Sequence, residues 1–475
     1  MITQFATLLT PHQVERIHEA SLEILENVGL LVRNEKARVL LARHGCPVDS
    51  ETDIVQFPRR VVEHFRAAYP PTFTFHGRDP QYDRTIPDDG PLAMTASSAP
   101  NLIDPVTGRE RRARSDDMAR IAHLFNELPA LDLFSVSVLC DDAPEGHFSL
   151  SRYYPALKNT VKPVRGNVPD VTEAQKVIRL GELVAGSAAA FRERPFITFH
   201  YCAVVSPLTL GSDSTELLIY LTEKGIPGYA SIVPNAGLTS PLTLIGTLAQ
   251  GNAEFLAWAT LQQMVRPGAE LIYSAFPTVG DMRTGAYAPG GIETGIMITG
   301  FAQMARYYNV PNAGYVGLTN AKLVDAQAGF EKGMSPSIAV LAGLDLVNVA
   351  GLIDALMTFD FGMMVIDNEI MAMIKRVKRG LEFSQEDLAL DLIAEAGPAG
   401  MFLDKQHTVD RMKSCAVLPE VANREPHQTW LEKGGLDAQG KAMQWVKEIL
   451  TRDNPAVFSP DVDARIRAEF VDLVA

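Results

Sequence analysis

Cysteine is scarce in this chain of 475 residues, and the four that occur form no CxxC pair. Sparse, scattered cysteines argue against a disulfide framework and favour a reducing compartment. Long apolar runs are also missing, since the longest fall short of the roughly 20 residues that a membrane-spanning helix needs. No basic segment followed by an apolar one, as in an export signal, is found near Met1. We therefore expect a soluble, cytoplasmic protein.

Positive charge is in deficit, because 43 Lys and Arg face 57 Asp and Glu, for a formal net charge of −14. Such an acidic chain is a poor partner for nucleic acid or for an anionic membrane. The one short basic stretch, residues 109–114, is broken by Glu110 and Ala113 and is expected to be a solvated loop. Glycine-rich phosphate loops are absent as well, since neither GxGxxG nor GxxxxGK[ST] occurs.

The chain does contain a regular alternation of short apolar runs and helical patterns. Eight runs, most of them followed by an amphipathic stretch, are typical of a (β/α)8 barrel within the α/β class. A doubly wound open sheet is the alternative, but it would usually carry a glycine-rich loop after an early strand. The runs span residues 92–103, 133–140, 163–167, 196–205, 228–233, 270–276, 312–318 and 344–349.

Flanking segments complete the predicted organisation. Residues 1–90 are expected to form a helical extension whose first helix begins with a capping box of Thr10 and Gln13 around Pro11. The barrel occupies residues 91–380. Residues 381–475 are expected to form a helical region that packs on the barrel and begins with a polar helix over 384–396.

Polar and aromatic residues cluster just after the apolar runs, where a barrel carries its function. They are interpreted as candidates for an active site at the barrel rim. The alternative is that they only satisfy one another and the helix N-termini, as Asp325 would as an N-cap. The candidates are His200, Tyr201, Cys202, Asn235, Phe276, Asp281, Arg283, Tyr315, Asn320, Lys322, Gln327, Glu331 and Phe359.

A zinc site is a further alternative. His200 and Cys202 are two residues apart on a predicted strand, so they face the same side. A third ligand is harder to find, since only Cys415 in the C-terminal region or Asp281 could serve. A packed strand His and Cys is the favoured interpretation, with no metal bound directly.

Several motifs resemble the trimethylamine methyltransferase family of corrinoid-dependent enzymes, and the resemblance covers essentially the whole chain. Two stretches are the most specific, DMRTG at 281–285 and DAQAGFEK at 325–332. The resemblance implies a barrel enzyme of one-carbon metabolism, including methanogenesis, that moves a methyl group from an amine to cobalt. The other matching stretches are 104–108, 266–269, 276–277, 319–324, 365–370 and 397–403.

One departure from the family pattern concerns the substrate. Trimethylamine enzymes of the family carry pyrrolysine, which the resemblance would place near Leu318 and Thr319, and this chain has none. Relatives without pyrrolysine resemble enzymes that demethylate quaternary amines. The resemblance therefore implies glycine betaine as the first guess, with proline betaine, carnitine or another methylated amine as alternatives. A non-catalytic betaine-binding protein is the alternative from another class.

The chemistry assigns roles to the rim residues. A quaternary ammonium leaves as a neutral amine and needs no general acid, so the site must hold a cation that offers no hydrogen bond, which aromatic faces do. Tyr201, Phe276, Tyr315 and Phe359 are the aromatic candidates. Arg283, Lys322 and Asn320 are candidates for the betaine carboxylate. Asp281 and Glu331 are the catalytic candidates, expected to act on binding more than on rate, and His200, Asn235 and Gln327 complete the substrate-binding set.

The methyl acceptor is expected to come from outside. No D-x-H-x-x-G pattern for binding cobalamin occurs, because Asp404 precedes His407 by three residues. We therefore expect the corrinoid, as cob(I)alamin or methylcobalamin, on a separate corrinoid protein that docks at the barrel mouth. The resemblance also favours a homo-oligomer.

Overall fold

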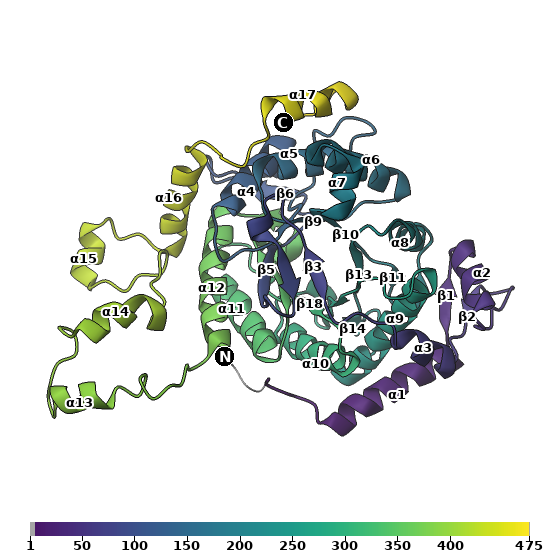
Figure 1. Cartoon of the computed structure of the whole chain (residues 1–475), viewed down its shortest axis with the longest axis horizontal. Coiled ribbons are helices and arrows are strands. Elements are labelled where there is room, and N and C mark those ends of the chain that lie inside the picture. Colours follow the sequence, from purple (N-terminus) through teal and green to yellow (C-terminus); the bar gives the residue numbers. More distant parts are fainter. Residues whose placement is uncertain (1–4, 475) are drawn as a thin grey trace.

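Eight parallel strands close into a barrel at the centre of the computed structural model, which describes residues 5–474 (Figure 1). The strands follow one another around the barrel in chain order, and a bridge between Met94 and Leu133 joins the first strand to the second. The predicted (β/α)8 barrel is confirmed, and each of the eight runs marks the position of one barrel strand. The strands are β5 (Leu92–Thr95), β8 (Phe134–Ser135), β9 (Val164–Gly166), β10 (Ile197–Tyr201), β13 (Gly228–Ile232), β15 (Tyr273–Ala275), β18 (Asn312–Tyr315) and β19 (Leu346–Ala350).

A helix follows each barrel strand along the chain and packs on the outside of the barrel (Figure 1). α9 is buried almost all round, because helices of the N-terminal region cover its outer face. No helix among residues 5–474 combines the length and the apolar composition that crossing a membrane requires. The barrel helices are α4 (Ser115–Asn126), α5 (Leu150–Asn159), α6 (Val171–Ala185), α8 (Ser212–Lys224), α9 (Leu244–Val265), α10 (Ile292–Tyr308), α11 (Ala326–Leu341) and α12 (Phe361–Arg379), with the short α7 (Ala188–Glu193) after α6.

The N-terminal region mixes helices with strands. The capping box is present, since Thr10 Oγ1 accepts from the backbone N of Gln13 at 3.3 Å and Gln13 Oε1 accepts from the N of Thr10 at 2.9 Å. A small sheet joins this region to the loop after β10, through a pairing of Leu31 with Thr209 that no local pattern reveals. Its elements are α1 (Pro11–Asn27), β1 (Leu30–Val32), α2 (Glu35–Arg43), β2 (Ile54–Val55) and α3 (Arg59–Arg66), and the loop supplies β11 (Val204–Val205) and β12 (Thr209–Leu210).

A hairpin of β3 (Phe73–Phe75) and β4 (Arg84–Ile86), with the short 3-10 helix η1 (Pro80–Tyr82) between them, closes the amino end of the barrel. Phe73, Phe75 and Ile86 are fully buried in one cluster with barrel residues such as Leu92 and Leu346. These apolar side chains fill the amino end of the barrel.

Small sheets extend the walls at the carboxyl end. One combines the loops after β5 and β19, and the other combines the loops after β13 and β15. Together they raise a rim around the mouth of the barrel. The first contains β6 (Asn101–Ile103), β7 (Glu110–Arg112), β20 (Leu352–Ile353) and β21 (Thr358–Phe359), with the short 3-10 helix η2 (Asp354–Leu356), and the second contains β14 (Asn235–Ala236), β16 (Thr278–Asp281) and β17 (Ala286–Ala288).

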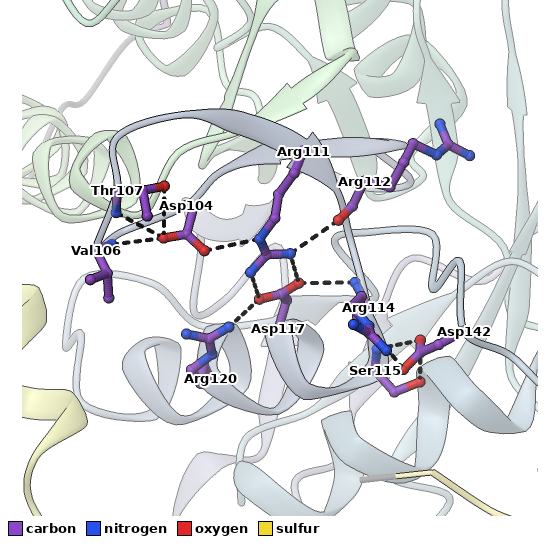
Figure 2. Close-up of polar contacts among 10 residues, drawn as sticks. All are labelled: Asp104, Val106, Thr107, Arg111, Arg112, Arg114, Ser115, Asp117, Arg120 and Asp142. Carbon is purple, nitrogen blue, oxygen red and sulfur yellow. Dashed lines mark hydrogen bonds and ion pairs between the residues drawn. The ribbon is translucent and has the colours of Figure 1, made fainter.

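Arg111 clamps the β6–β7 hairpin onto α4 (Figure 2). Its Nε donates to Asp104 at 2.9 Å, and its two Nη atoms donate to the buried carboxylate of Asp117 at 2.7 and 2.9 Å. Asp117 also accepts from Arg120 and from the backbone N of Arg114. The expectation of a merely solvated basic loop at residues 109–114 was therefore wrong for Arg111, because two carboxylates contributed by other parts of the chain surround it.

The C-terminal region divides into two parts. α16 (Ala438–Leu450) packs against α12 and α4, and α17 (Pro460–Glu469) packs against α6. α13 (Leu390–Ala396), α14 (Gln406–Cys415) and α15 (His427–Glu432) contain no buried residue and stand apart from the barrel (Figure 1). The helix expected over 384–396 begins only at Leu390, because Ser384 forms a local turn with Asp387 and Ala389 has a φ of 50°.

Asp345 joins the amino ends of β18 and β19, since its Oδ2 accepts from the backbone N and the Nδ2 of Asn312 at 3.0 and 2.7 Å. Burial raises the pKa of Asp345 to about 7. Below pH 7 the folded carboxyl binds a proton that the unfolded chain binds only near pH 4, so this contribution to stability grows as the pH falls. Between pH 8 and pH 5 it amounts to about 2 kcal/mol.

We therefore expect Asp345→Asn to stabilise the fold relative to the wild type more at pH 8 than at pH 5. Chemical denaturation at both pH values measures the difference. An equal effect of the substitution at the two pH values would contradict the assignment.

Candidate active site

A cavity of about 320 Å³ opens at the carboxyl ends of the barrel strands, within the usual size range of small-molecule sites. Larger hollows of about 520 and 890 Å³ lie elsewhere, one beside Lys162 at the amino end and one beside α1. Barrel enzymes carry their chemistry at the carboxyl ends, so the smaller cavity is the candidate active site. Its lining is Ser97, Ser98, Asn167, Val168, Pro169, His200, Tyr201, Cys202, Ser214, Leu217, Ser231, Val233, Phe276, Tyr315 and Leu356.

No Asp, Glu, Lys or Arg is among these lining residues. The one titratable base, His200, is buried, and its Nε2 lies 2.7 Å from Ser231 Oγ. Burial, and then the positive charge of Arg165, hold the pKa of His200 well below its usual range, so the ring is neutral at physiological pH. The surface that meets a ligand is therefore uncharged.

Two stacked aromatic rings form part of the wall. Phe276 and Tyr315 lie with their centroids 4.4 Å apart and their planes 18° from parallel, and Tyr287 meets Phe276 edge-on at 6.2 Å. Burial raises the pKa of Tyr315 to about 12, so its hydroxyl keeps its proton. Neutral π-faces of this kind attract a cation that offers no hydrogen bond.

Arg165 lies immediately behind this wall. Its side chain leaves β9 inside the barrel, donates to Tyr315 Oη, and donates from Nη1 to Ser135 Oγ at 2.5 Å and to Ser97 Oγ at 3.4 Å. The guanidinium is 5.5 Å from the Tyr315 ring centroid. The buried positive charge of Arg165 is therefore separated from the cavity by only one side chain.

Four of the predicted substrate-binding residues line the cavity together, namely His200, Tyr201, Phe276 and Tyr315. They come from the ends of β10, β15 and β18, where parallel strands deliver neighbouring side chains to the same edge. Cys202, the second zinc candidate, also lines the cavity, and the structure places the remaining predicted residues outside the lining. These are Asn235, Asp281, Arg283, Asn320, Gln327, Glu331 and Phe359, together with Lys322.

Glu331 holds the loop after β18 rather than facing the cavity. Its Oε2 accepts from Thr319 Oγ1 at 2.5 Å and from the backbone N of Asn320 at 2.8 Å, and its Oε1 accepts from Gln327 Nε2 at 2.9 Å. The side-chain amide of Asn320 in turn accepts from the backbone N of Gly290 and donates to the carbonyl oxygen of Tyr287, both in the loop after β15. The DAQAGFEK stretch thus encodes a brace that joins two rim loops.

Asp281 and Arg283 pair with each other on the β16–β17 hairpin, with Nη2 and Oδ2 2.7 Å apart. The side chain of Arg283 is 87% exposed, because the hairpin carries it away from the barrel axis. Lys322 likewise turns outward to Asp354 at 3.2 Å. None of these charged groups contributes to the lining.

Asn235 and Phe359 have structural contacts in the rim sheets. The backbone carbonyl of Asn235 accepts from three successive N–H groups, those of Leu238, Thr239 and Ser240, and so shapes a tight loop. Phe359 is fully buried beside Phe361, with ring centroids 5.3 Å apart. Both residues therefore stabilise the rim sheets without lining the cavity.

Sequence reasoning missed Arg165 and Arg152, and with them Ser97, Ser98, Asn167 and Ser231. Arg165 lies in the predicted run 163–167 as the one charge within it, and a charge inside an apolar barrel strand was the available signal. Arg152 gave no such sequence signal, because it lies in a helix, α5, where an arginine is not unusual.

No three His, Cys, Asp or Glu side chains come together as a metal site would require in the part of the chain from residue 5 to 474. His200 Nε2 is bonded to Ser231, and Asp281 is bonded to Arg283. Cys415 lies on α14, which stands apart from the barrel (Figure 1). The residues considered for a zinc site are therefore not assembled around one point.

Comparisons with known proteins agree over the full length. The profile of the trimethylamine methyltransferase (MTTB) family matches residues 2–473. A glycine betaine methyltransferase of Desulfitobacterium hafniense strain Y51 is 30% identical over 466 residues, 97% of this chain and 96% of that protein. A trimethylamine methyltransferase MttB of D. hafniense strain DSM 10664 / DCB-2 is 30% identical over 456 residues, 95% of this chain and 91% of that protein.

Among solved structures, a dihydropteroate synthase of Coxiella burnetii aligns with a TM-score of 0.39 and 12% identity, over 65% of this chain and 99% of that one. The barrel assignment rests on the strand order described above. The family assignment rests on the match of the profile to nearly every residue. The chain therefore belongs to the trimethylamine methyltransferase family, whose members are corrinoid-dependent methyltransferases.

Proposed function

We propose that this protein demethylates a quaternary amine, with glycine betaine as the first candidate, and passes the methyl group to Co(I) of a separate corrinoid protein. One similar protein is named for glycine betaine and another for trimethylamine, so names alone do not choose between the two substrates. The choice follows from the cavity.

The observation that carries the proposal is the uncharged, aromatic lining. The stacked Phe276 and Tyr315 offer π-faces, and no lining residue is a carboxylate that would pair with a protonated amine. A quaternary ammonium has no N–H to donate, so aromatic faces are its natural partners, at roughly 1 to 2 kcal/mol each in a dry site. The lining suits a permanent cation better than a neutral amine.

The reaction also places few demands on proton transfer. When a methyl group leaves a quaternary nitrogen, the bonding electron pair stays on nitrogen and a neutral tertiary amine departs. Neither Asp281 nor Glu331 reaches the cavity, and His200 is neutral and already hydrogen-bonded. The side chains at the site can therefore hold and orient the substrate without supplying a proton.

A reduced corrinoid supplies the nucleophile for the methyl carbon. Apolar side chains of the cavity lining, including Val168, Pro169, Val233 and Leu356, add no charge where a corrinoid brought by a partner would meet the substrate. Excluding water here strengthens the electrostatic interactions of the site as the charges on donor and acceptor cancel. Other betaines, such as proline betaine or carnitine, share the same ammonium chemistry.

Mixing the purified protein with cob(I)alamin and candidate amines tests the proposal. Glycine betaine is expected to give one methylcobalamin and one dimethylglycine per turnover, followed by absorbance and mass spectrometry. Trimethylamine at the same concentration is expected to give neither methylcobalamin nor dimethylamine. The proposal is overturned if no betaine is demethylated or if trimethylamine is the better donor, and a betaine that binds without turnover indicates a binding protein.

A further inference from the structure

Two arginines beside the cavity are fully buried and have no carboxylate partner. Arg152 and Arg165 are 0% and 1% exposed, and neither takes part in an ion pair of residues 5–474. Their hydrogen bonds go to hydroxyl, amide and carbonyl oxygens, and the Nε of each has no partner. Two positive charges are thus buried without a negative one.

Such an arrangement is costly unless an anion completes it. A guanidinium does not lose its proton in a protein, and a buried charge without a counter-ion loses most of its hydration. Elsewhere buried Lys332 meets Asp367 at 3.1 Å, whereas buried Lys162 donates to three backbone carbonyl oxygens. Lys162 is a single charge, while Arg152 and Arg165 are two charges that reach one segment of the cavity lining. The missing anion near Arg152 and Arg165 therefore points to a ligand.

Both arginines converge on the segment Ser97–Ser98, which lines the cavity. Arg165 Nη1 donates to Ser97 Oγ, while Arg152 Nη2 donates to Ser98 Oγ and to Asn167 Oδ1, each at 2.9 Å. These acceptors leave the hydroxyl proton of Ser97 and the Nδ2 group of Asn167 free to donate to a ligand. Ser98 has a φ of 74°, a left-handed conformation that is uncommon for serine and concentrates at functional sites.

We propose that Ser97, Ser98 and Asn167, backed by Arg165 and Arg152, form a carboxylate subsite of the cavity. The inference rests on the proposed function for the other half of the ligand, a quaternary ammonium on Phe276 and Tyr315. Tyr315 touches both halves, because its ring stacks on Phe276 and its hydroxyl accepts from Arg165. The substrate is thus a zwitterion whose two charges are close together, and a cation without a carboxylate is a poor ligand.

Three small molecules test the ammonium subsite and the carboxylate subsite separately. Glycine betaine carries both charges, choline carries only the ammonium, and 3,3-dimethylbutyrate carries only the carboxylate on a carbon skeleton of the same shape. Titration calorimetry of the wild-type protein is expected to show binding of 3,3-dimethylbutyrate and at least tenfold weaker binding of choline than of glycine betaine. Choline that binds as tightly as glycine betaine would overturn the subsite.

The decisive variant is Arg165→Gln. It is expected to lower the affinities for glycine betaine and 3,3-dimethylbutyrate by roughly 10- to 100-fold, because the buried positive charge behind Ser97 is lost, and to leave the affinity for choline within about threefold. Arg78→Gln is the matched control, because Arg78 donates to the carbonyl oxygens of Thr160 and Ala456, forms no ion pair within residues 5–474, and lies away from the cavity. It is expected to change none of the three affinities. An equal loss for choline in Arg165→Gln would show a merely structural role.

A milder variant, Ser97→Ala, tests the subsite if Arg165→Gln does not fold. Ser97→Ala removes a donor that faces the ligand and is expected to lower the affinity for the two carboxylates alone. Unchanged carboxylate affinity contradicts the subsite.

The experiments can also contradict one proposal while supporting the other. Binding of 3,3-dimethylbutyrate that depends on Arg165, without demethylation of any betaine, retains the subsite and removes the methyltransferase proposal. Demethylation of glycine betaine that is unaffected by Arg165→Gln does the reverse.

Discussion

Lys332→Met is expected to lower the free energy of unfolding by about 3 to 5 kcal/mol, the usual effect of removing one partner of a buried ion pair. Lys332 and Asp367 are both fully buried, with Nζ and Oδ2 3.1 Å apart. Burial raises the pKa of Asp367 to about 6 even though Lys332 lowers it. Without Lys332, the folded variant must either keep an unpaired buried carboxylate or protonate it, and each costs stability at pH 7.5. Chemical denaturation at pH 7.5 measures the loss.

The same lysine joins the ends of two barrel strands. Its Nζ donates to the carbonyl oxygens of Gly317 at 2.8 Å and Val349 at 2.7 Å, just beyond β18 and β19. Asp367 accepts from the backbone N of Gly351 at 2.8 Å. The pair therefore positions the rim next to Tyr315, and its loss is expected to reduce activity as well as stability.

A double-mutant cycle identifies the cause. Asp367→Asn combined with Lys332→Met removes the unpaired charge while keeping an acceptor for Gly351, and it is expected to recover at least half of the lost stability. Lys176→Met serves as the control, because Lys176 pairs with Glu173 only three residues away on α6 and is partly exposed, so its expected loss is at most about 1 kcal/mol. A strictly additive double mutant would contradict the explanation.

Tyr315→Leu is expected to lower kcat/KM for glycine betaine by roughly 100-fold. The substitution removes one aromatic face, at about 1 to 2 kcal/mol, and leaves the Arg165 guanidinium without one acceptor, at about 1 to 3 kcal/mol. Steady-state methyl transfer to cob(I)alamin measures the change.

Two further variants separate these contributions. Tyr315→Phe keeps the ring and removes the hydroxyl, so it is expected to lose about tenfold, whereas Phe276→Leu removes only an aromatic face and is also expected to lose about tenfold. Tyr220→Phe is the control, because Tyr220 lies on α8 and does not line the cavity, and it is expected to behave as the wild type. Full activity of Tyr315→Leu would show that the cation is held elsewhere.

Much of the fold could be predicted because barrel units are local in sequence. A strand of two to five residues and the helix after it each have their own sequence pattern, so all eight strands and the capping box at Thr10 were predicted. The pairing of Leu31 with Thr209 was not, since two short strands that meet across 178 residues carry no mark of each other. The late start of α13 depends on one turn at Ser384, which the helical pattern did not predict.

The candidate site divides in a similar way. His200, Tyr201, Phe276 and Tyr315 were predicted as substrate-binding residues, and the structure brings them into one cavity, while their role in binding remains a proposal. Asp281 and Arg283 lie further along the loop after β15, and Glu331 lies in α11, and all three bond to groups of their own rim segments. Position in the chain indicates which loop a residue belongs to, whereas the direction of the side chain depends on the partners that the loop meets.

By itself the sequence determined the barrel, its order of strands and helices, and the family. The reason is that periodic burial and specific motifs are patterns of residues close together in the sequence. Only the tertiary structure decided which side chains enclose the cavity and that Arg152 and Arg165 have no acidic partner among the residues the structure describes. The physical reason is that charge balance is a property of neighbours in space. A buried arginine resembles any other arginine along the chain until the groups around it are known.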